Sequence, residues 1–223
     1  MTLWPAVWVS LNLAFLSTLI LIALGLPLAW WLATTRSVLR PAIEAITTLP
    51  LVLPPTVLGF YLLILFSPEA ALGGAWVRLT GETLTFSFAG LVLASCLYSL
   101  PFAVQPMQTA FASTGREAME AARTLGASSG DAFRAIALPL ARRGVLTAAV
   151  LSFAHTLGEF GVVLMVGGNI PGRTRVISIE IFTAVETLDY ATAHVLSAGL
   201  LGFSFLVLVV LYALNGRGAR PLG

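Results

Sequence analysis

The sequence contains no lysine, a single cysteine and few charged residues of either sign. Its 223 residues include twelve arginines, ten acidic residues and two histidines. The absence of lysine excludes from this chain any mechanism that needs that residue, including the phosphate-binding lysine of a P-loop. The lone Cys96 excludes an intrachain disulfide, and its place in an apolar segment predicts a small buried residue.

Apolar residues take the place of the missing charges. The chain is 58% hydrophobic and 10% charged, with a mean hydropathy of +0.94, whereas soluble domains carry about 25% charged residues. Four uncharged spans each exceed the roughly 20 residues that cross a bilayer, and a fifth apolar span is interrupted only by Glu159. The sequence therefore predicts an all-α integral membrane protein, a polytopic bundle of about five transmembrane helices.

The expected helices follow these spans, and prolines punctuate three of them. They cover residues 6–35, 45–66, 86–113, 141–168 and 193–214. We expect one domain, 1–223, because no repeat or linker divides the chain. Residues 1–35 lack the basic start of a cleaved signal, which predicts a retained helix. Prolines survive in membrane helices where neighbouring helices or a wet cavity satisfy the freed backbone groups. They therefore favour a bundle around a pathway, although kinked structural helices have the same pattern.

Arginine counts predict the orientation. With the N-terminus outside, the cytoplasmic segments hold nine arginines and the outer loops hold only Arg78, Arg173 and Arg175. The inner nine are Arg36, Arg40, Arg116, Arg123, Arg134, Arg142, Arg143, Arg217 and Arg220. Because basic residues accumulate on the cytoplasmic side, we expect the N-terminus outside and the C-terminus inside.

The polar stretch "EAARTLGASSGDAFRAIALP", residues 120–139, is then a cytoplasmic loop. A run of apolar residues at helical spacing stops just before Gly126. Helices commonly end in a residue with left-handed backbone angles, which glycine adopts readily. Ser128 and Asp131 resemble a capping box that starts a second short helix. Pro139 is expected to end that helix, because proline disfavours helical geometry in the preceding residue. These signals therefore predict that the loop, about residues 114–140, forms two short helices joined at a glycine elbow.

The same stretch resembles the cytoplasmic loop motif of permease subunits in binding-protein-dependent ABC importers. The matching residues are Glu120, Ala121, Ala122, Gly126, Ile136, Leu138 and Pro139. The segments 49–63, 99–111 and 153–175 are similar to molybdate permease subunits and, more distantly, to sulfate permeases. The resemblance covers nearly the whole chain.

This resemblance implies a transport subunit of the bacterial inner membrane and not an enzyme. The loop would couple the helices to a separate cytoplasmic ABC ATPase, and a periplasmic molybdate-binding protein would dock outside. A permease homodimer surrounded by membrane lipid is also implied. We expect no cofactor, no metal, no catalytic residue and no nucleic-acid partner. The resemblance implies molybdate as cargo, whereas residue spacing alone leaves tungstate and sulfate open, since both are tetrahedral dianions close to molybdate.

The segment "HTLGEFG" supplies a second candidate site, a gate or pathway lining formed by His155, Gly158, Glu159 and Gly161. A carboxylate inside a membrane span is a functional hypothesis by default. Glu159 is expected toward the outer end of its span, and the two glycines permit close helix approach or bending. The alternative is a structural residue that pairs near the interface or holds the helix end. His155 could be a neutral hydrogen-bonding residue.

Two outer segments and two other protein classes complete the predictions. The turn-rich residues 167–175 could form a cationic lip or help to seat the binding protein, together with a short helix in 176–190.

A proton-coupled secondary transporter using Glu159 and His155 is an alternative, but the chain lacks the internal repeats common in that class. A membrane enzyme has less support, because no nucleophile and base or metal-ligand cluster stands out.

Overall fold

Every regular element in the structure, a computed structural model that describes residues 3–113, 124 and 126–216, is a helix. The elements are α1 (Trp4–Thr34), α2 (Arg40–Val52), α3 (Pro55–Phe66), α4 (Ala71–Thr80), α5 (Phe88–Ser113), α7 (Ser129–Ala132), the π-helical η1 (Phe133–Ala137), α8 (Leu138–Gly158), α9 (Gly161–Gly167), α10 (Ile177–Glu186) and α11 (Tyr190–Gly216). The predicted all-α membrane fold is confirmed.

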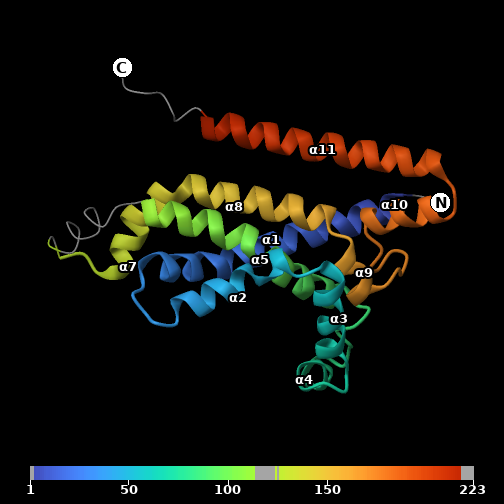
Figure 1. Ribbon diagram of the computed structural model, residues 1–223, viewed down its shortest axis with the longest axis horizontal. Coiled ribbons are helices and arrows are strands. Elements are labelled where there is room, and N and C mark those ends of the chain that lie inside the picture. Colours follow the sequence, from blue (N-terminus) through green and yellow to red (C-terminus); the bar gives the residue numbers. More distant parts are fainter. Residues whose placement is uncertain (1–2, 114–123, 125, 217–223) are drawn as a thin grey trace.

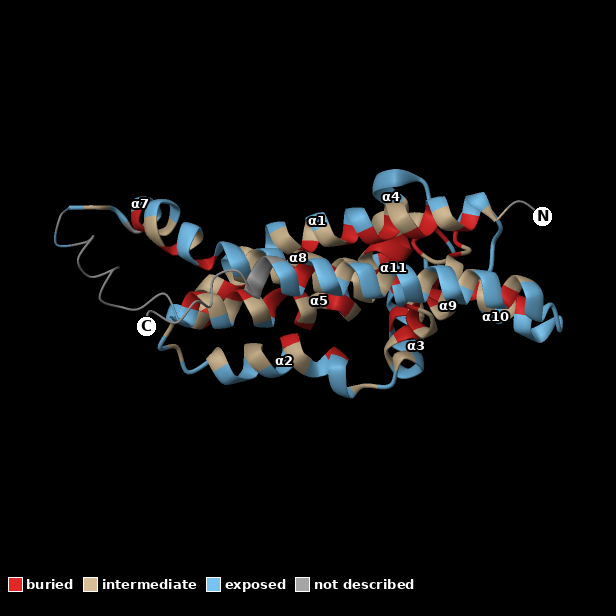
Figure 2. Ribbon diagram, turned by 90° about the horizontal axis from the view of Figure 1, so that it is seen from above, coloured by how far each residue is buried: buried red, intermediate tan, exposed pale blue. Residues whose placement is uncertain are grey.

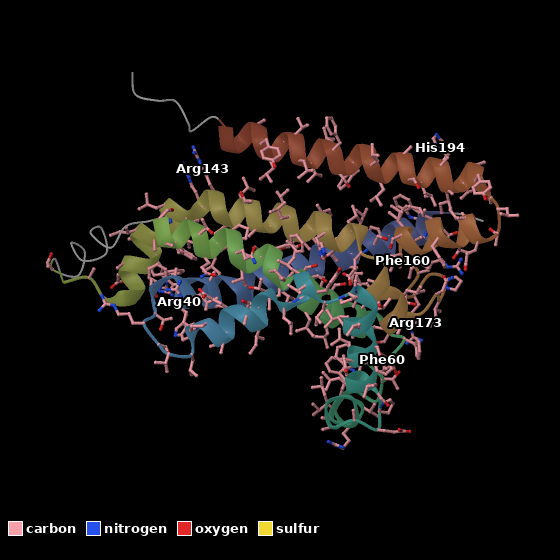
Figure 3. The ribbon with its side chains drawn as sticks, viewed as in Figure 1. Arg40, Phe60, Arg143, Phe160, Arg173 and His194 are labelled. Atoms are coloured by element: carbon pink, nitrogen blue, oxygen red, sulfur yellow. The ribbon has the colours of Figure 1, made fainter. Side chains whose placement is uncertain are left out.

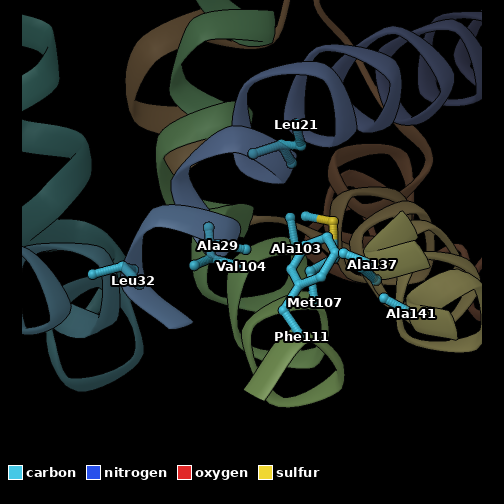
Figure 4. Close-up of a cluster of buried hydrophobic side chains, with 10 residues drawn as sticks. Leu21, Ala29, Leu32, Ala103, Val104, Met107, Phe111, Ala137 and Ala141 are labelled. Atoms are coloured by element: carbon cyan, nitrogen blue, oxygen red, sulfur yellow. The ribbon is translucent and has the colours of Figure 1, made fainter. Parts of the chain in front are cut away.

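Three long helices, α1, α5 and α8, pack pairwise along their lengths and form the centre of the bundle (Figure 1). Small and medium apolar side chains fill the space between them, including Ala29, Ala103, Met107 and Ala141 (Figure 4). Small residues let helix backbones approach closely in membranes. Buried positions gather where these helices face one another, while α2 and α11 expose most of their surface (Figure 2).

Four helical segments are long and apolar enough to span a membrane by length and composition. They are Trp4–Thr34, Phe88–Ser113, Gly130–Gly158 and Tyr190–Ala213. The pair α2 and α3 gives a fifth span if it is counted as one broken span. The exposed apolar side chains on α2, α3 and α11 suit a lipid environment, where no polar surface is needed.

The expected single helix over 45–66 is wrong, because α2 and α3 are separate helices bent by 113°. The break lies at Leu53 and Pro54, both of which have extended backbone angles. Proline pushes the residue before it out of helical geometry, and Pro54 and Pro55 follow each other. By contrast, α1 continues through Pro27 and α5 through Pro101 and Pro106. Isolated prolines are thus accommodated within these packed helices without ending them.

The expected helix over 141–168 is also interrupted, at Glu159 and Phe160, between α8 and α9. An additional helix, α4, occupies the segment after α3, where none was predicted. The short helix expected within 176–190 is present as α10, and its Ile179 and Ala184 are buried. It packs on α11, α1 and α8, so it is part of the fold and not only a surface element.

The bundle has two distinct ends, which we name by their short helices (Figure 1). At the α7 end lie α7, the first turns of α8 and the end of α11. At the α10 end lie the start of α1, α9 and α10. Arg40 and Arg143 lie toward the α7 end, and Arg173 and His194 lie toward the α10 end (Figure 3).

Candidate functional site

The structure describes the second part of the loop motif, from Gly126 to Pro139. Glu120, Ala121 and Ala122 lie outside the described residues. Gly126 has φ +88°, which confirms the left-handed elbow that its place in the sequence predicted. A Cβ at Gly126 would meet no atom within 4 Å, so conformation and not space selects glycine there.

The helix after the elbow begins as predicted but does not end at Pro139. The Asp131 backbone N–H donates to Ser128 Oγ at 3.2 Å, and the Ser128 hydroxyl bonds the Asp131 carboxylate. The chain then runs through η1 into α8, and Leu138 keeps helical angles. Its backbone N–H donates to the Phe133 carbonyl, five residues back. This π-helical turn lies directly before Pro139. Its backbone hydrogen bonds span five residues and not four, next to a proline that has no N–H to donate.

An aromatic cluster attaches this segment to the bundle. Phe133 in η1 packs edge-on against Trp30 of α1, with ring centroids 5.2 Å apart, and lies 5.9 Å from Phe111 of α5. Ala137 and Ala141 on the same face are buried, while Ile136 and Leu138 are half-buried. The helical segment Gly130–Gly158 is therefore continuous from α7 into α8 and is packed on α1 and α5 at its start.

His155 lies on α8 against an aromatic surface of α5. Its ring stacks on Phe102 at 4.0 Å between centroids and lies 4.9 Å from Tyr98. Its Nδ1 is 2.8 Å from Ser99 Oγ, and the same hydroxyl is 2.9 Å from Thr156 Oγ1. One Ser99 hydroxyl therefore bridges two α8 side chains and fixes the orientation of the imidazole.

Glu159 occupies the break after α8 and is almost fully buried, with 4% of its surface exposed. Its backbone has extended angles, and its carbonyl accepts a hydrogen bond from the Ser178 hydroxyl of α10. Within the described residues, neither carboxylate oxygen has a hydrogen-bond partner. Ser95 of α5 is a polar neighbour of this carboxyl group, but the pair lacks hydrogen-bond geometry.

Among the described residues Glu159 has no ion-pair partner, so the structural alternative in which it pairs near the interface finds no support there, whereas its place directly after α8 fits the alternative in which it holds the helix end. The ion pairs in the described part of the chain are Arg40–Glu44 and Arg175–Glu180. Four hydroxyls are also buried without a hydrogen-bond partner among the described residues, those of Ser17, Thr18, Ser95 and Ser152. Buried polar groups without partners are rare in folded proteins and call for an explanation such as water or a functional role. The described part of the bundle therefore buries several polar side-chain groups in an apolar surrounding.

The break at Glu159 lies beside the break at Pro54. A Cβ placed on Gly161 would lie 2.8 Å from Pro55 Cβ, and one on Gly59 would lie 2.7 Å from Met165 Cβ. Glycine at these two positions lets the side chains of Pro55 and Met165 pack directly on the backbone of the facing helix, so that α3 and α9 lie close together. Gly158 differs, because a Cβ there would meet nothing within 4 Å. Of the two expected roles, close approach is found at Gly161, whereas Gly158 lies where α8 ends and the chain changes direction.

Sequence reasoning missed the residues that connect these features. No local sequence pattern pointed to the roles of Ser95, Ser99 and Ser178 or to the contact of Trp30 with Phe133, because the partners lie far apart in the chain. Spacing of Ser95 and Ser99 by four residues could have indicated one polar helix face. Among the described residues, no group of three or more His, Cys, Asp or Glu side chains is placed to hold a metal ion.

Comparison with known proteins gives a consistent set of relatives. Residues 8–217 match the family described as binding-protein-dependent transport system inner membrane component. The chain is 55% identical over 208 residues to a molybdenum transport system permease protein, ModB, of Azotobacter vinelandii, covering 93% of this chain and 92% of the relative. It is 34% identical to the sulfate transport system permease protein CysT of Escherichia coli, covering 96% and 78%.

Solved structures agree with this fold. The MetNI methionine ABC transporter in an inward-facing conformation matches with a TM-score of 0.75, covering 98% of this chain and 96% of that one. A bacterial ABC transporter that imports alginate matches with a TM-score of 0.71. At 19% sequence identity, both likenesses concern the fold alone.

Proposed function

The chain belongs to the family of binding-protein-dependent transport system inner membrane components, and we propose that it is the permease subunit of an ABC importer for molybdate. The observation that supports this cargo is the 55% identity to a molybdenum transport permease over nearly the full length of both chains. Sulfate is the second candidate, favoured by the 34% identity to a sulfate permease. Tungstate shares the same charge and shape.

Uptake measurements in a reconstituted importer test the cargo. Proteoliposomes would hold this chain with its ATPase subunit, and the molybdate-binding protein of the same organism would be added outside. We expect ATP-dependent uptake of labelled molybdate that tungstate inhibits and that excess sulfate leaves largely intact. Equal inhibition by sulfate would favour the sulfate assignment. Uptake driven by a proton gradient without ATP would instead favour a secondary transporter.

The energy source is proposed to be a separate ATPase that binds the α7 end. The chain contains no lysine and therefore no P-loop. The loop residues Glu120, Ala121 and Ala122 and the elbow at Gly126 would form the docking element. Small alanines permit close approach of the partner, and Glu120 can anchor the element electrostatically. The continuous helical segment from α7 into α8 supports this role, because a rigid element passes on a displacement that a flexible loop would absorb.

This assignment places the α7 end in the cytoplasm and the α10 end outside the bacterial inner membrane. The arginines support that orientation, nine against three, by the positive-inside rule. In Figure 3, Arg40 and Arg143 lie toward one end and Arg173 toward the other. A homodimer would then bring two copies of the bundle together around the pathway, with lipid on the remaining apolar faces.

We propose that the two adjacent breaks form the outer gate of the pathway. Because α3 and α9 interlock at Gly59 and Gly161, they are expected to move together about the breaks at Pro54 and Glu159. His155 and Glu159 would line the passage beside the gate, where the buried hydroxyls provide polar surface. A neutral imidazole held by Ser99 can offer its other ring nitrogen to an oxyanion without trapping it as a fixed cation would.

A further inference from the structure

One face of α5 carries polar and aromatic side chains in the middle of a membrane span. The residues that share this face follow at helical spacings of three or four and are Tyr98, Phe102, Gln105 and Thr109. Gln105 and Thr109 are exposed, whereas Tyr98 and Phe102 are half-buried. At 1.5 Å per residue, Gln105 lies about 12 Å before the end of α5 at Ser113. It therefore lies inside the span and not at its end.

Two helices flank this face of α5, α8 on one side and α2 on the other (Figure 1, Figure 2). Toward α8, the Phe102 ring stacks on His155, with ring centroids 4.0 Å apart. Toward α2, the Gln108 amide donates to the Glu44 carboxylate at 2.7 Å. The exposed Gln105 lies between these two contacts along α5, so both flanking helices border the part of the face that stays uncovered.

The hydrogen-bonding groups of the uncovered face are unused. Within the described part of the chain, neither the Gln105 amide nor the Thr109 hydroxyl takes part in a hydrogen bond. Lipid tails offer such groups no partner, and a polar group that leaves water without a hydrogen bond raises the free energy. Polar residues inside membrane spans therefore face the interior of a bundle or a water-filled cavity. By this argument the face of α5 contacts water and not lipid.

This face offers hydrogen bonds without a fixed charge. The helix α5 contains no charged residue. The carboxylate that contacts α5, that of Glu44, also accepts from Arg40 at 2.9 Å, so a neighbouring cation offsets its charge. An anion on this face would meet neutral donors, without an arginine to hold it or an uncompensated carboxylate to repel it. Passage through a membrane protein needs such a balance, in which binding permits entry but is weak enough for release.

We propose that Gln105 and Thr109 line the water-filled pathway and donate hydrogen bonds to the tetrahedral oxyanion as it moves along α5 toward the α7 end. The glutamine amide supplies two N–H donors and the threonine hydroxyl supplies one, and oxyanion oxygens accept from both. Hydrogen bonds to a charged group are stronger than those between neutral groups. The inference rests on the proposed function, because it takes an oxyanion as the cargo.

Thiol labelling tests whether this face contacts water. The complex of this chain with its ATPase would be placed in nanodiscs, with Gln105→Cys or Thr109→Cys in a Cys96→Ser background, and treated with a membrane-impermeant anionic thiosulfonate. Leu201→Cys is the matched control, because Leu201 is an exposed apolar residue on the span formed by α11. Only a thiol in contact with water ionises to the reactive thiolate, so we expect the two α5 cysteines to react about tenfold faster or more.

Two labelling results would overturn the lining. Reaction as slow as that of Leu201→Cys would place the face in lipid. A disulfide between two copies at Gln105→Cys, formed on oxidation without labelling by the reagent, would place the face in an interface between helices. Neither result depends on which cargo the importer carries.

Uptake by proteoliposomes tests the contact with the oxyanion. Gln105→Met keeps the length of the side chain without its donors, and we expect it to slow molybdate uptake about tenfold, as for one lost hydrogen bond to a charged group. Gln105→Glu adds a like charge and should slow uptake further. Stimulation of ATP hydrolysis by the loaded binding protein should remain in both variants, because the coupling loop is unchanged.

Wild-type uptake in both Gln105 variants would overturn the contact with the oxyanion while leaving the importer intact. Absence of molybdate uptake by the wild-type complex would instead overturn the proposed function and, with it, the oxyanion as the ligand of this face. The labelling experiment would still decide whether the face lines a water-filled pathway.

Discussion

Gly161 packs so closely on Pro55 that a Cβ at the glycine would lie 2.8 Å from the proline Cβ. The two residues follow two different breaks, Pro55 the break before α3 and Gly161 the break before α9. The contact therefore joins two chain interruptions that are more than a hundred residues apart in the sequence. It shows that α3 and α9 are closely packed on each other, which is the basis of the proposed gate.

The first prediction concerns Gly161→Ala. The added methyl group forces Pro55 and α3 away from α9, and overpacking of this kind destabilises by about 1–3 kcal/mol. We expect a lower midpoint of thermal unfolding in detergent and reduced molybdate uptake. Gly158→Ala is the matched control on the other side of Glu159, because it adds the same methyl group in open space. Equal effects of both substitutions would contradict the interlocked helix pair.

The second prediction concerns Gly126→Val at the elbow. Its φ of +88° is strained for a residue with a branched side chain, at about 1–2 kcal/mol. We expect the variant to insert and fold but to lose stimulation of ATP hydrolysis by the loaded binding protein. Gly130→Ala in α7 is the control, since a Cβ there has only the Ser128 hydroxyl at 3.9 Å. Intact coupling in Gly126→Val would show that the elbow is dispensable.

The third prediction concerns Ser99→Ala in α5. Removing this hydroxyl leaves His155 Nδ1 and Thr156 Oγ1 without their shared partner, and an unsatisfied buried polar group costs about 1–3 kcal/mol. We expect lower thermal stability and lower uptake. Ser113→Ala on the same helix removes only an exposed bond to the Ala110 carbonyl. If both variants had the thermal stability and uptake of the wild type, the Ser99 bridge would not stabilise the fold.

The fourth prediction concerns Glu159→Gln. Glutamine keeps the shape, and a neutral amide is less unfavourable to bury than an unpaired carboxylate. We therefore expect an unchanged or higher unfolding midpoint together with slower uptake, by roughly tenfold, equivalent to ~1.4 kcal/mol in the barrier. Glu186→Gln, on exposed α10 surface, should change neither. A large loss of stability in Glu159→Gln would indicate a structural role for the charge instead.

The long apolar helices could be predicted from the sequence within a few residues. α1, α5 and α11 follow uncharged runs longer than a bilayer requires, so their existence depends only on local composition. The elbow at Gly126 and the cap at Ser128, whose hydroxyl accepts from the Asp131 N–H, were also predicted, because both depend on local sequence. The π turn before Pro139 was not, since whether proline ends a helix depends on packing such as that of Phe133 on Trp30.

The polar contacts of the candidate site could not be predicted in the same way. Ser99 and His155 are 56 positions apart, and their contact depends on the rotation of α5 against α8. The composition placed Glu159 in a span, but both a paired and an unpaired carboxylate fit that pattern. The surroundings of Glu159 depend on where α8 ends, at Gly158, and on the position of α10. From α10, the Ser178 hydroxyl donates to the Glu159 backbone carbonyl, and no cationic residue of that helix pairs with the Glu159 carboxylate.

The sequence by itself determined that this chain enters a membrane, which end carries most of its positive charge and which loop has the coupling motif. Each of these depends on residue type and spacing, which act locally or add along the chain. Only the tertiary structure decided that two distant breaks meet at Pro55 and Gly161, and that hydroxyl groups of α1, α5 and α8 are buried without a hydrogen-bond partner among the described residues. Those features depend on how helices rotate and pack, and that is set by close contacts between small residues far apart in the sequence.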